Sequence, residues 1–252
     1  VREHLDKMRD GSVRLAGAGI GVPGPIRPDG YLEVCVNIGM RDMNPVKELS
    51  ALLGGIPVQG GNDANVAALG EVWQGGGKGY KDVVAVTLGT GVGGGVILDG
   101  RIVAGSKGMG GEIGHMAVVP ENGELCYCGK YGCFDTVCRA GKLDEYTNGN
   151  LEEFFHRLGA GDERAAALWD VYLDHLASAI YNIRILFDCK VILGGYVGAY
   201  IGDYLEDLYQ RVDEKNPFED KAEDYIFACR YKKEASAAGA AIFFVDEFLS
   251  DI

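Results

Sequence analysis

Long apolar runs are missing from this sequence. No stretch reaches the roughly 18 consecutive apolar residues that a membrane-spanning helix needs, and we expect no secretory signal. A fixed-period internal repeat is also missing, as is a linker that would clearly separate two domains. We therefore expect a cytoplasmic protein with no membrane partner.

Positive charge is in short supply. The chain has 24 Lys and Arg residues against 37 Asp and Glu residues, for a formal net charge of −13. Nucleic acid binding depends on basic side chains that displace counterions from phosphates, so we expect none by this segment alone. The 252 residues are 47% hydrophobic, which is the content of an ordinary globular protein and enough for one large domain or two lobes.

Three of the seven cysteines are crowded into eight residues, at Cys126, Cys128 and Cys133, with His115 shortly before them. One imidazole and three thiolates form a closed tetrahedral zinc site, and four protein ligands leave no open position for catalysis. Disulfides are rare in a reducing cytosol, so metal ligation is the favoured interpretation. A redox cluster or a chance grouping is the alternative. The other cysteines are predicted to be small core residues: Cys35, Cys138, Cys189 and Cys229.

Segments typical of strands and helices alternate along the chain, which predicts an α/β fold. The strands are expected at Leu15–Val22, Ile56–Gln59, Asp82–Leu88, Val96–Leu98, Arg101–Val103, Val191–Leu193 and near Tyr225–Arg230. The helices are expected from Pro45 (capped by Asn44) to Gly54, at Ala64–Trp73, Leu151–Leu158, Ala165–Phe187 and Ala235–Phe248, with the tail of another at Val1–Arg9.

A glycine-rich loop, LGTGVGGG at Leu88–Gly95, follows a buried strand. Backbone N–H groups in such a loop can approach phosphate oxygens, and the Thr90 hydroxyl can add a donor. The chain continues into a hairpin turn at Asp99-Gly100 and not into a helix. This excludes a Rossmann or Walker loop and favours a phosphate clamp on a β-hairpin. A purely structural turn is the alternative.

Two acidic residues are candidates for the chemistry. Asp63 follows Asn62 at a strand end and opens a helix, where a carboxylate can take the proton of a hydroxyl that attacks a γ-phosphate. The alternative is that Asp63 only caps the helix. Glu112 lies three residues before His115, so a metal that fixes His115 would also place Glu112 near a polyol. The alternative for Glu112 is a solvated surface carboxylate.

Five motifs in order resemble the ROK family, named for repressors, open reading frames and kinases. They are GIGVPGP (Gly19–Pro25), GNDANVAALGE (Gly61–Glu71), LGTGVGGG, GEIGHM (Gly111–Met116) and CYCGKYGC (Cys126–Cys133). The resemblance runs from about Leu15 to Phe244, and Asn62–Met116 is most similar to bacterial glucokinases of this family.

The resemblance implies an actin-like, RNase H-like ATPase fold with two lobes and a sugar cleft between them. The small lobe would be N-terminally incomplete. The expected division is residues 1–62 as the rest of the small lobe, 63–235 as the large lobe with the zinc loop, and 236–252 as a C-terminal helix that packs back on the small lobe.

The resemblance also implies roles for individual residues. Asp63 would be the catalytic base. Sugar contacts would come from Gly24, Asn62, Glu112, His115 and Asp135, with His115 also binding zinc through its other nitrogen. ATP phosphate would contact Gly89, Thr90, Gly91 and Gly93, and the adenosine side would contain Gly194, Gly195 and Ala237–Ala241.

Three departures from the family pattern stand out. Asp135 stands where the family usually has Glu, whose side chain is one methylene longer. Cys138 stands where the family frequently has Ser. The Asp-x-Gly-Gly-Thr loop with which the family opens, and which helps to place magnesium, is absent from these 252 residues. We therefore expect either that residues upstream of Val1 are missing from this sequence or that the gene is truncated.

The expected function is ATP-dependent phosphorylation of a hexose or amino sugar, glucokinase-like, with ATP, magnesium and structural zinc as cofactors. A homodimer or homotetramer is expected. The alternative is the sugar-sensing effector domain of a ROK repressor, which would keep the same sugar site. A third interpretation is a degenerate fragment without activity. Asp63 and the intact glycine-rich loop favour the kinase, whereas Asp135, Cys138 and the absent first phosphate loop favour the sensor. The sequence leaves open which sugar is bound and whether ATP or polyphosphate is the donor.

Overall fold

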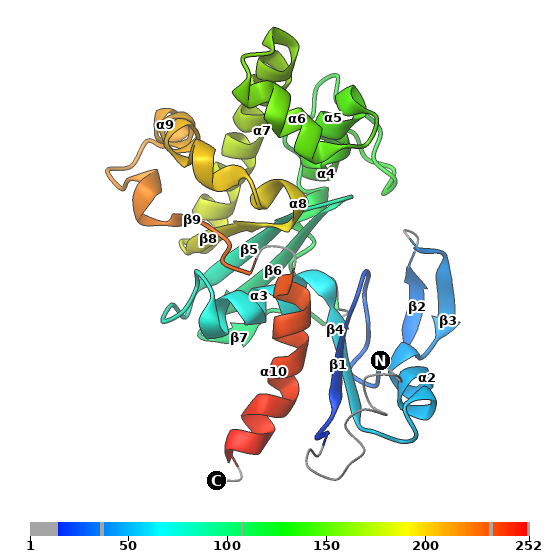
Figure 1. Cartoon of the computed structure of the whole chain (residues 1–252). Coiled ribbons are helices and arrows are strands. Elements are labelled where there is room, and N and C mark those ends of the chain that lie inside the picture. Colours follow the sequence, from blue (N-terminus) through cyan, green and yellow to red (C-terminus); the bar gives the residue numbers. More distant parts are fainter. Residues whose placement is uncertain (1–14, 36–37, 107, 232–233, 251–252) are drawn as a thin grey trace.

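The computed structural model describes residues 15–35, 38–106, 108–231 and 234–250, arranged in two lobes (Figure 1). The helix tail predicted at Val1–Arg9 lies outside the described residues. The fold is α/β, as predicted.

The large lobe is built on a five-stranded sheet in the order β7-β6-β5-β8-β9. Its strands are β5 (Val83–Leu88), β6 (Val92–Leu98), β7 (Arg101–Ile102), β8 (Lys190–Gly194) and β9 (Ile226–Ala228). The central strand, β5, pairs antiparallel with β6 and parallel with β8. Its valines are fully buried, because helices cover both faces of the sheet.

One face of this sheet carries a helical layer and the other a single helix (Figure 1). The layer contains α4 (Phe134–Cys138), α5 (Gly141–Asp144), α6 (Leu151–Gly159), α7 (Glu163–Phe187), α8 (Gly195–Gly198) and α9 (Leu205–Lys215). The main hydrophobic core lies between this layer and the sheet. The other face is covered by α3 (Asp63–Gln74), where Ala68 packs with Ala85 and Ile97.

In its described residues, the small lobe contains two strand pairs and one helix. β1 (Ala18–Val22) pairs in parallel with β4 (Val58–Asn62), and β2 (Leu32–Cys35) pairs antiparallel with β3 (Met40–Met43). The helix is α2 (Pro45–Leu52), and its predicted cap is confirmed, since the Asn44 side chain accepts a hydrogen bond of 2.9 Å from the Lys47 amide.

The structure corrects one strand boundary in the glycine-rich region. We expected a loop as far as Gly95 and a strand from Val96, but β6 begins at Val92, so Gly93, Gly94 and Gly95 are strand residues. A Cβ on Gly95 would lie 2.5 Å from both the Ala64 carbonyl oxygen and the Ala68 side chain. Gly93 and Gly95 therefore let α3 lie close against the sheet, whereas Gly94 lets Gly111 and Ile113 approach it.

The final helix, α10 (Ala235–Ser250), packs on α3 and on β1 and so joins the two lobes (Figure 1). Close approach is made possible by glycine. A Cβ on Gly239 would overlap the carbonyl oxygen of Val66 in α3, and one on Gly19 in β1 would overlap the carbonyl of Ala240. The domain limits predicted near residues 62 and 235 remain predictions.

Gly239→Ala is expected to destabilise the protein by about 1–3 kcal/mol, the usual cost of overpacking. Helix propensity alone would predict the opposite sign, since alanine in a helix is favoured over glycine by about 1 kcal/mol. Here the backbone of α3 blocks the added methyl group. Urea unfolding of Gly239→Ala beside Gly159→Ala tests this. A Cβ on Gly159 in α6 meets nothing within 4 Å, so the control should unfold at an unchanged or slightly higher urea concentration. Equal midpoints for the two variants would contradict the packing argument.

Candidate active site

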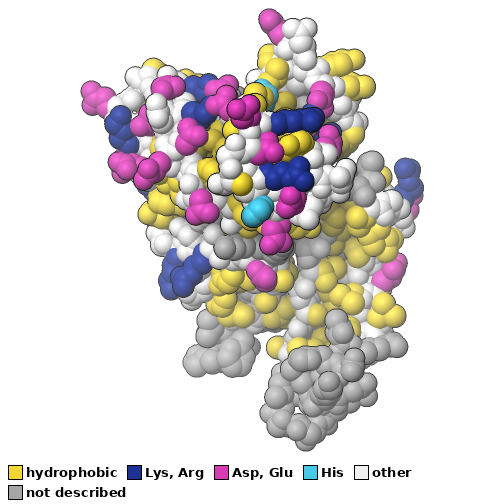
Figure 2. All heavy atoms as spheres, turned by 45° about the horizontal axis from the view of Figure 1, so that its top comes forward, with side chains coloured by type: hydrophobic (Ala, Val, Ile, Leu, Met, Phe, Trp, Pro, Cys, Tyr) yellow, Lys and Arg dark blue, Asp and Glu magenta, His cyan; other side chains and the backbone are white. Residues whose placement is uncertain are grey.

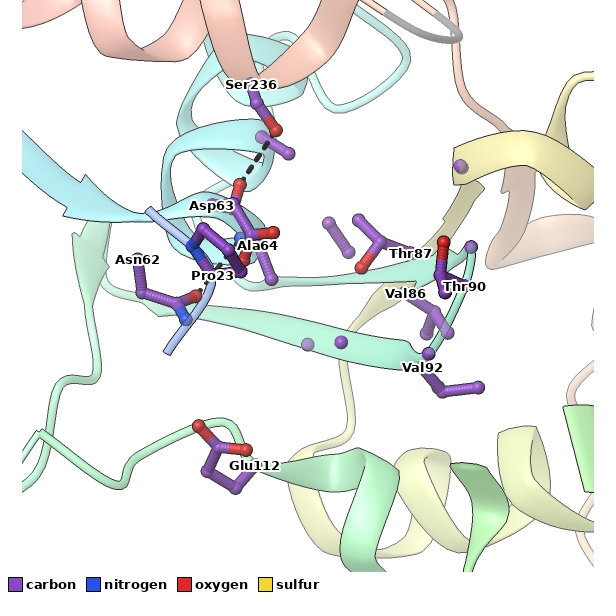
Figure 3. Close-up of a pocket in the computed structure, with 18 of the residues that line it drawn as sticks. Pro23, Asn62, Asp63, Ala64, Val86, Thr87, Thr90, Val92, Glu112 and Ser236 are labelled. Atoms are coloured by element: carbon purple, nitrogen blue, oxygen red, sulfur yellow. Dashed lines mark hydrogen bonds between the residues drawn. The ribbon is translucent and has the colours of Figure 1, made fainter. Parts of the chain in front are cut away.

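A cavity of about 730 Å³ is lined by both lobes. The small lobe contributes the turn after β1 and part of β2, and the large lobe contributes the loop between β5 and β6 and the start of α8. Figure 3 shows Asn62, Asp63 and Pro23 gathered in one part of this cavity, with Thr90 at the tip of the loop between β5 and β6.

Asp63 is placed by the two parallel strands of the small lobe. Val22 at the end of β1 pairs with Asn62 at the end of β4, and ligand sites of α/β proteins lie at such carboxyl ends of strands. The helix cap is Asn62, whose Oδ1 accepts from the amides of Ala64 and Asn65 at 3.1 Å each. The alternative in which Asp63 is itself the N-cap residue is therefore wrong. Asp63 lies at the first helical position, and its Oδ1 accepts from the Ala64 amide at 2.8 Å.

Asn62 also fixes the turn after β1. Its Nδ2 donates a hydrogen bond of 3.2 Å to the carbonyl oxygen of Gly24, which has a φ of 117° that other residues rarely adopt. The side chain therefore holds the turn and the start of α3 together. One of the two Nδ2 hydrogens is used in this way, and Asn62 and Gly24 both line the cavity.

Burial raises the pKa of Asp63 above its ordinary value, and the Ala64 amide offsets part of this rise. Burial also raises the pKa of Glu112, with His115 acting in the opposite sense and the Asp63 charge adding to the rise. The two carboxyl groups are therefore close enough to influence each other. Figure 3 shows Glu112 on the opposite side of the cavity from Asp63.

Ser236 was not found from the sequence. Its hydroxyl, at the start of α10, donates a hydrogen bond of 2.9 Å to the backbone carbonyl of Asp63 (Figure 3). The residues are 173 positions apart, and no local pattern marks such a pair. Ser236 lines the cavity, whereas Gly239 and Ala240, in the segment expected on the adenosine side, pack on α3 and β1.

Glu71 is a second residue for which the sequence predicted no structural role. This carboxylate is 2% exposed and accepts hydrogen bonds from three backbone amides, those of Gly76, Arg230 and Tyr231, at 2.8–3.1 Å. A buried carboxylate needs such donors to offset its desolvation. Glu71 thus fastens the end of α3 to the chain that leads toward α10.

The β5–β6 loop consists of Gly89, Thr90 and Gly91, with the Gly89 amide donating to the Gly91 carbonyl at 2.9 Å. All three residues line the cavity, as does Gly93 on β6. Asp135 reaches this loop from α4, since its Oδ1 accepts a hydrogen bond of 2.7 Å from the Val92 amide. The carboxylate that we expected to face a sugar is therefore engaged with the backbone beside the loop through one oxygen.

Gly194 and Gly195 lie at the junction of β8 and α8, next to the β5–β6 loop. Gly194 pairs with Thr87, and a Cβ on Gly195 would lie 2.7 Å from the backbone of Leu88. Gly195 has a φ of 80°, so glycine is required by conformation as well as by space. Both line the cavity together with Tyr196.

His115, Cys126, Cys128 and Cys133 come together as one cluster, with all ligand atoms within 4.8 Å of one another. The Cys128–Cys133 sulfur distance is 3.6 Å, and Cys126 Sγ lies 3.6 Å from His115 Nδ1. A sulfur separation of 3.6 Å excludes a disulfide, whose bond is about 2.05 Å. Tetrahedral zinc with bonds of about 2.0–2.3 Å requires ligand separations of roughly 3.5–3.8 Å, so the cluster fits this ion.

The thiols in this cluster are not equivalent. Burial raises the pKa of Cys133 to about 12, and burial likewise raises the pKa of Cys126. The backbone amide of Lys130 lowers the pKa of the exposed Cys128. Two of the three thiols would therefore stay protonated at neutral pH unless a cation replaced their protons, as metal binding does.

Tyr127, between two of the cysteines, is a further site residue that the sequence reading missed. Its hydroxyl lies 2.9 Å from His115 Nε2, and its ring meets the histidine ring edge-on at a centroid distance of 4.9 Å. The Nδ1 atom of His115 thus faces Cys126, and its Nε2 atom faces the Tyr127 hydroxyl. The Cys-Tyr-Cys spacing was the available signal, since a residue between two ligands on a tight turn points away from the metal.

The ROK family model matches residues 1–247. The chain belongs to the ROK family. A glucokinase from Halalkalibacterium halodurans is 39% identical over 223 residues, which are 78% of this chain and 67% of the relative. An N-acetylmannosamine kinase from Salmonella typhi is 31% identical over 212 residues, covering 82% of this chain and 71% of the relative.

Solved structures of the family share this fold. The ROK hexokinase from Thermus thermophilus superimposes with a TM-score of 0.78 at 29% identity, over 98% of this chain and 84% of its own. A ROK transcriptional regulator homologous to the E. coli MLC protein gives a TM-score of 0.80 at 23% identity, over 97% of this chain and 66% of its own, which is a likeness of fold alone. The ROK chain therefore has the actin-like ATPase fold.

Basic and acidic side chains are mixed on one face of the protein surface. Among the described side chains on the face shown in Figure 2, Lys and Arg lie interspersed with Asp and Glu. None of the helices that the structure describes has the length and apolar character needed to cross a membrane. The expected homodimer or homotetramer and the expected lack of nucleic acid binding stay predictions.

Proposed function

We propose that this ROK chain transfers the γ-phosphoryl group of ATP to a hydroxyl group of a hexose or an amino sugar. One observation carries the proposal. Because Asn62 caps α3, the Asp63 carboxyl group is left at the first helical position, in the same cavity as the β5–β6 loop. The glucokinase and N-acetylmannosamine kinase relatives support the sugar class.

Asp63 would orient the attacking hydroxyl group and accept its proton late in the transfer. Phosphoryl transfer depends mainly on positioning and on electrostatic stabilisation, so a well-placed carboxylate is sufficient as base. Its neighbours hold it in place, since Ser236 bonds its backbone carbonyl and Ala64 bonds its Oδ1. Magnesium bound with ATP would supply charge neutralisation on the phosphates.

The nucleotide would occupy the large-lobe part of the cavity. The backbone amides of Gly89, Thr90 and Gly91 and the hydroxyl group of Thr90 would donate to phosphate oxygens. Gly93 lies tightly against β5, because a Cβ there would lie 2.6 Å from Thr87 Oγ1. Gly194 and Gly195 would form the adenosine side, where they lie against the end of β5.

The sugar would lie between the lobes. Its hydroxyl groups would form hydrogen bonds with Glu112, His115 and the free hydrogen of Asn62 Nδ2. The backbone of Gly24 would line the sugar site. Zinc held by His115 and the three cysteines would be structural, because four protein ligands fill its coordination sphere. It would keep the Glu112–His115 segment in a fixed position beside the sugar.

The test is ADP release from Mg-ATP over a panel of hexoses and N-acetylated amino sugars, with protein expressed from the complete gene and with thermal shift on the same samples. Sugar-dependent ADP release supports the kinase, and the sugar with the highest kcat/KM names the substrate. A melting shift with sugar but without ADP release would replace the kinase by the sugar-sensing domain. The same assay with polyphosphate in place of ATP shows which of the two is the phosphoryl donor.

The pH dependence of turnover follows from Asp63. Burial raises the pKa of this carboxyl group above its ordinary value, and the base must be ionised to accept a proton. The kcat value is therefore expected to fall on the acid side as pH is lowered toward this raised pKa, at a higher pH than an ordinary aspartate would give. A pH–kcat profile checks this. An acid limb at the pKa of an ordinary exposed aspartate would contradict the assignment.

A further inference from the structure

Asp135 contacts the backbone of the β5–β6 hairpin directly. Its Oδ1 atom accepts from the Val92 amide at 2.7 Å, and the residue is only 8% exposed. A short hydrogen bond from a backbone amide to a carboxylate is among the stronger kinds that proteins contain. Val92 is the residue immediately after the β5–β6 loop, so this bond fixes the position where the loop ends.

The loop is shaped around this carboxylate. A Cβ on Gly91 would lie 2.9 Å from Asp135 Oδ1, so the close approach requires glycine at that position. The other end of the loop is tied to the same segment, because the Ala140 amide donates to the Gly89 carbonyl at 2.8 Å. Both ends of the β5–β6 loop are thus attached to residues 135–140.

The same segment begins at the metal cluster. Cys133 is the N-cap residue of α4, and both the amide and the hydroxyl of Thr136 donate to its carbonyl oxygen, at 2.9 and 2.7 Å. Phe134, between Cys133 and Asp135, is fully buried in the core. The path from a predicted metal ligand to the β5–β6 loop is therefore only two residues long and rigidly packed.

We propose that Asp135 is a positioning residue that holds the β5–β6 loop ready for the nucleotide phosphates, and that its effect is on nucleotide binding and not on sugar binding. The inference rests on the proposed function for the role of the loop. It differs from the sugar contact expected from the sequence. A glutamate would place its carboxylate one methylene further out, whereas the aspartate side chain has the length that reaches Val92 beside Gly91.

Hydrogen exchange at the Val92 amide tests the contact without any ligand. Asp135→Ala removes the acceptor and is expected to speed exchange of this amide by about tenfold or more. Asp135→Asn keeps an acceptor oxygen and should stay within about threefold of the parent. Asp135→Glu adds a methylene where Gly91 already lies close, so it should resemble the alanine variant. Thr147→Ala, which removes another buried polar side chain with two hydrogen bonds, serves as control and should leave Val92 unchanged.

Calorimetry with a non-hydrolysable ATP analogue and Mg²⁺, and separately with glucose, gives the functional readout. Asp135→Ala should weaken nucleotide binding by about tenfold or more and leave the sugar Kd within about threefold. Sugar binding weakened tenfold with nucleotide binding unchanged would overturn the proposal, as would unaltered Val92 exchange in both Asp135→Ala and Asp135→Glu. If the parent protein binds no nucleotide while Val92 exchange responds as expected, the contact stands and the proposed function fails.

Discussion

Asp63→Asn is expected to lower kcat for sugar-dependent ADP release by about 10²- to 10⁴-fold, the usual contribution of a positioned general base. Asparagine keeps the oxygen that accepts from the Ala64 amide, so the geometry of α3 and of the cavity should be preserved. The amide cannot accept the hydroxyl proton. Sugar affinity, measured by calorimetry, is therefore expected to stay within about threefold of the parent value.

The same substitution has an expected effect on stability, with a sign opposite to its effect on turnover. Because burial raises the pKa of Asp63 in the folded protein, the folded state binds more protons than the unfolded state between the ordinary and the raised value. The free energy of unfolding therefore falls as pH rises through that window. Asp63→Asn removes this penalty, so the variant should unfold at higher urea concentration at neutral pH, and the difference should shrink in acid.

Asp99→Asn is the matched control. Asp99 lies in the turn between β6 and β7 with a φ of 50°, a conformation that asparagine also tolerates. This change should leave both turnover and the urea midpoint unaltered. Normal turnover in Asp63→Asn would show that Asp63 is not the catalytic base. A lower urea midpoint of Asp63→Asn at neutral pH would contradict the role of burial.

Cys128→Ser is expected to reduce bound zinc from about one ion per chain to almost none, because the serine hydroxyl is not among the side chains that normally bind zinc in proteins. Cys128 is the exposed member of the cluster, so the change leaves no core cavity. Loss of the ion should free the segment that carries Glu112 and His115. We expect sugar affinity to fall by about tenfold or more, which is the usual effect of losing groups that hold the binding residues in place.

Elemental analysis and calorimetry with glucose check this second prediction. Cys189→Ser is the control, since Cys189 is a buried cysteine outside the cluster. It should keep its zinc and its sugar affinity while losing some stability. A Cys128→Ser protein that binds sugar as tightly as the parent would show that the metal cluster does not support the sugar site.

Local sequence patterns predicted those features that depend on near neighbours. The cap at Asn44, the turn at Asp99-Gly100 and the cysteine cluster all lie within a few residues, so the residue types alone determine the geometry. The turn has φ angles of 50° and 73°, as a hairpin turn of this kind requires. Where the residue types favour one local geometry, that geometry can be predicted without knowledge of tertiary contacts.

The sequence could not decide between Asn62 and Asp63 as the helix cap, because both residue types cap helices well. The decision comes from β1, which places the Gly24 carbonyl where Asn62 Nδ2 can bond it. The strand β6 was missed at its start for a similar reason. Glycine is disfavoured in strands, so the run at Gly93–Gly95 indicates a loop locally. Its strand conformation is explained by the packing of α3 on Gly93 and Gly95 and of Gly111 and Ile113 on Gly94.

The hairpin of β2 and β3 was also not predicted. Each strand has only four residues, LEVC and MRDM, too few to show a convincing alternation. The contacts of Ser236 and Asp135 depend on chain segments 173 and 43 residues away, and no spacing rule reaches so far.

Phosphoryl transfer to a sugar can be followed directly by ³¹P NMR of the reaction mixture. With Mg-ATP and the sugar that gives the highest kcat/KM, we expect a sugar phosphate resonance that grows in step with ADP, one for one, and that is lost in Asp63→Asn. ADP accompanied only by inorganic phosphate, or no change in ATP while sugar still shifts the melting temperature, would contradict it.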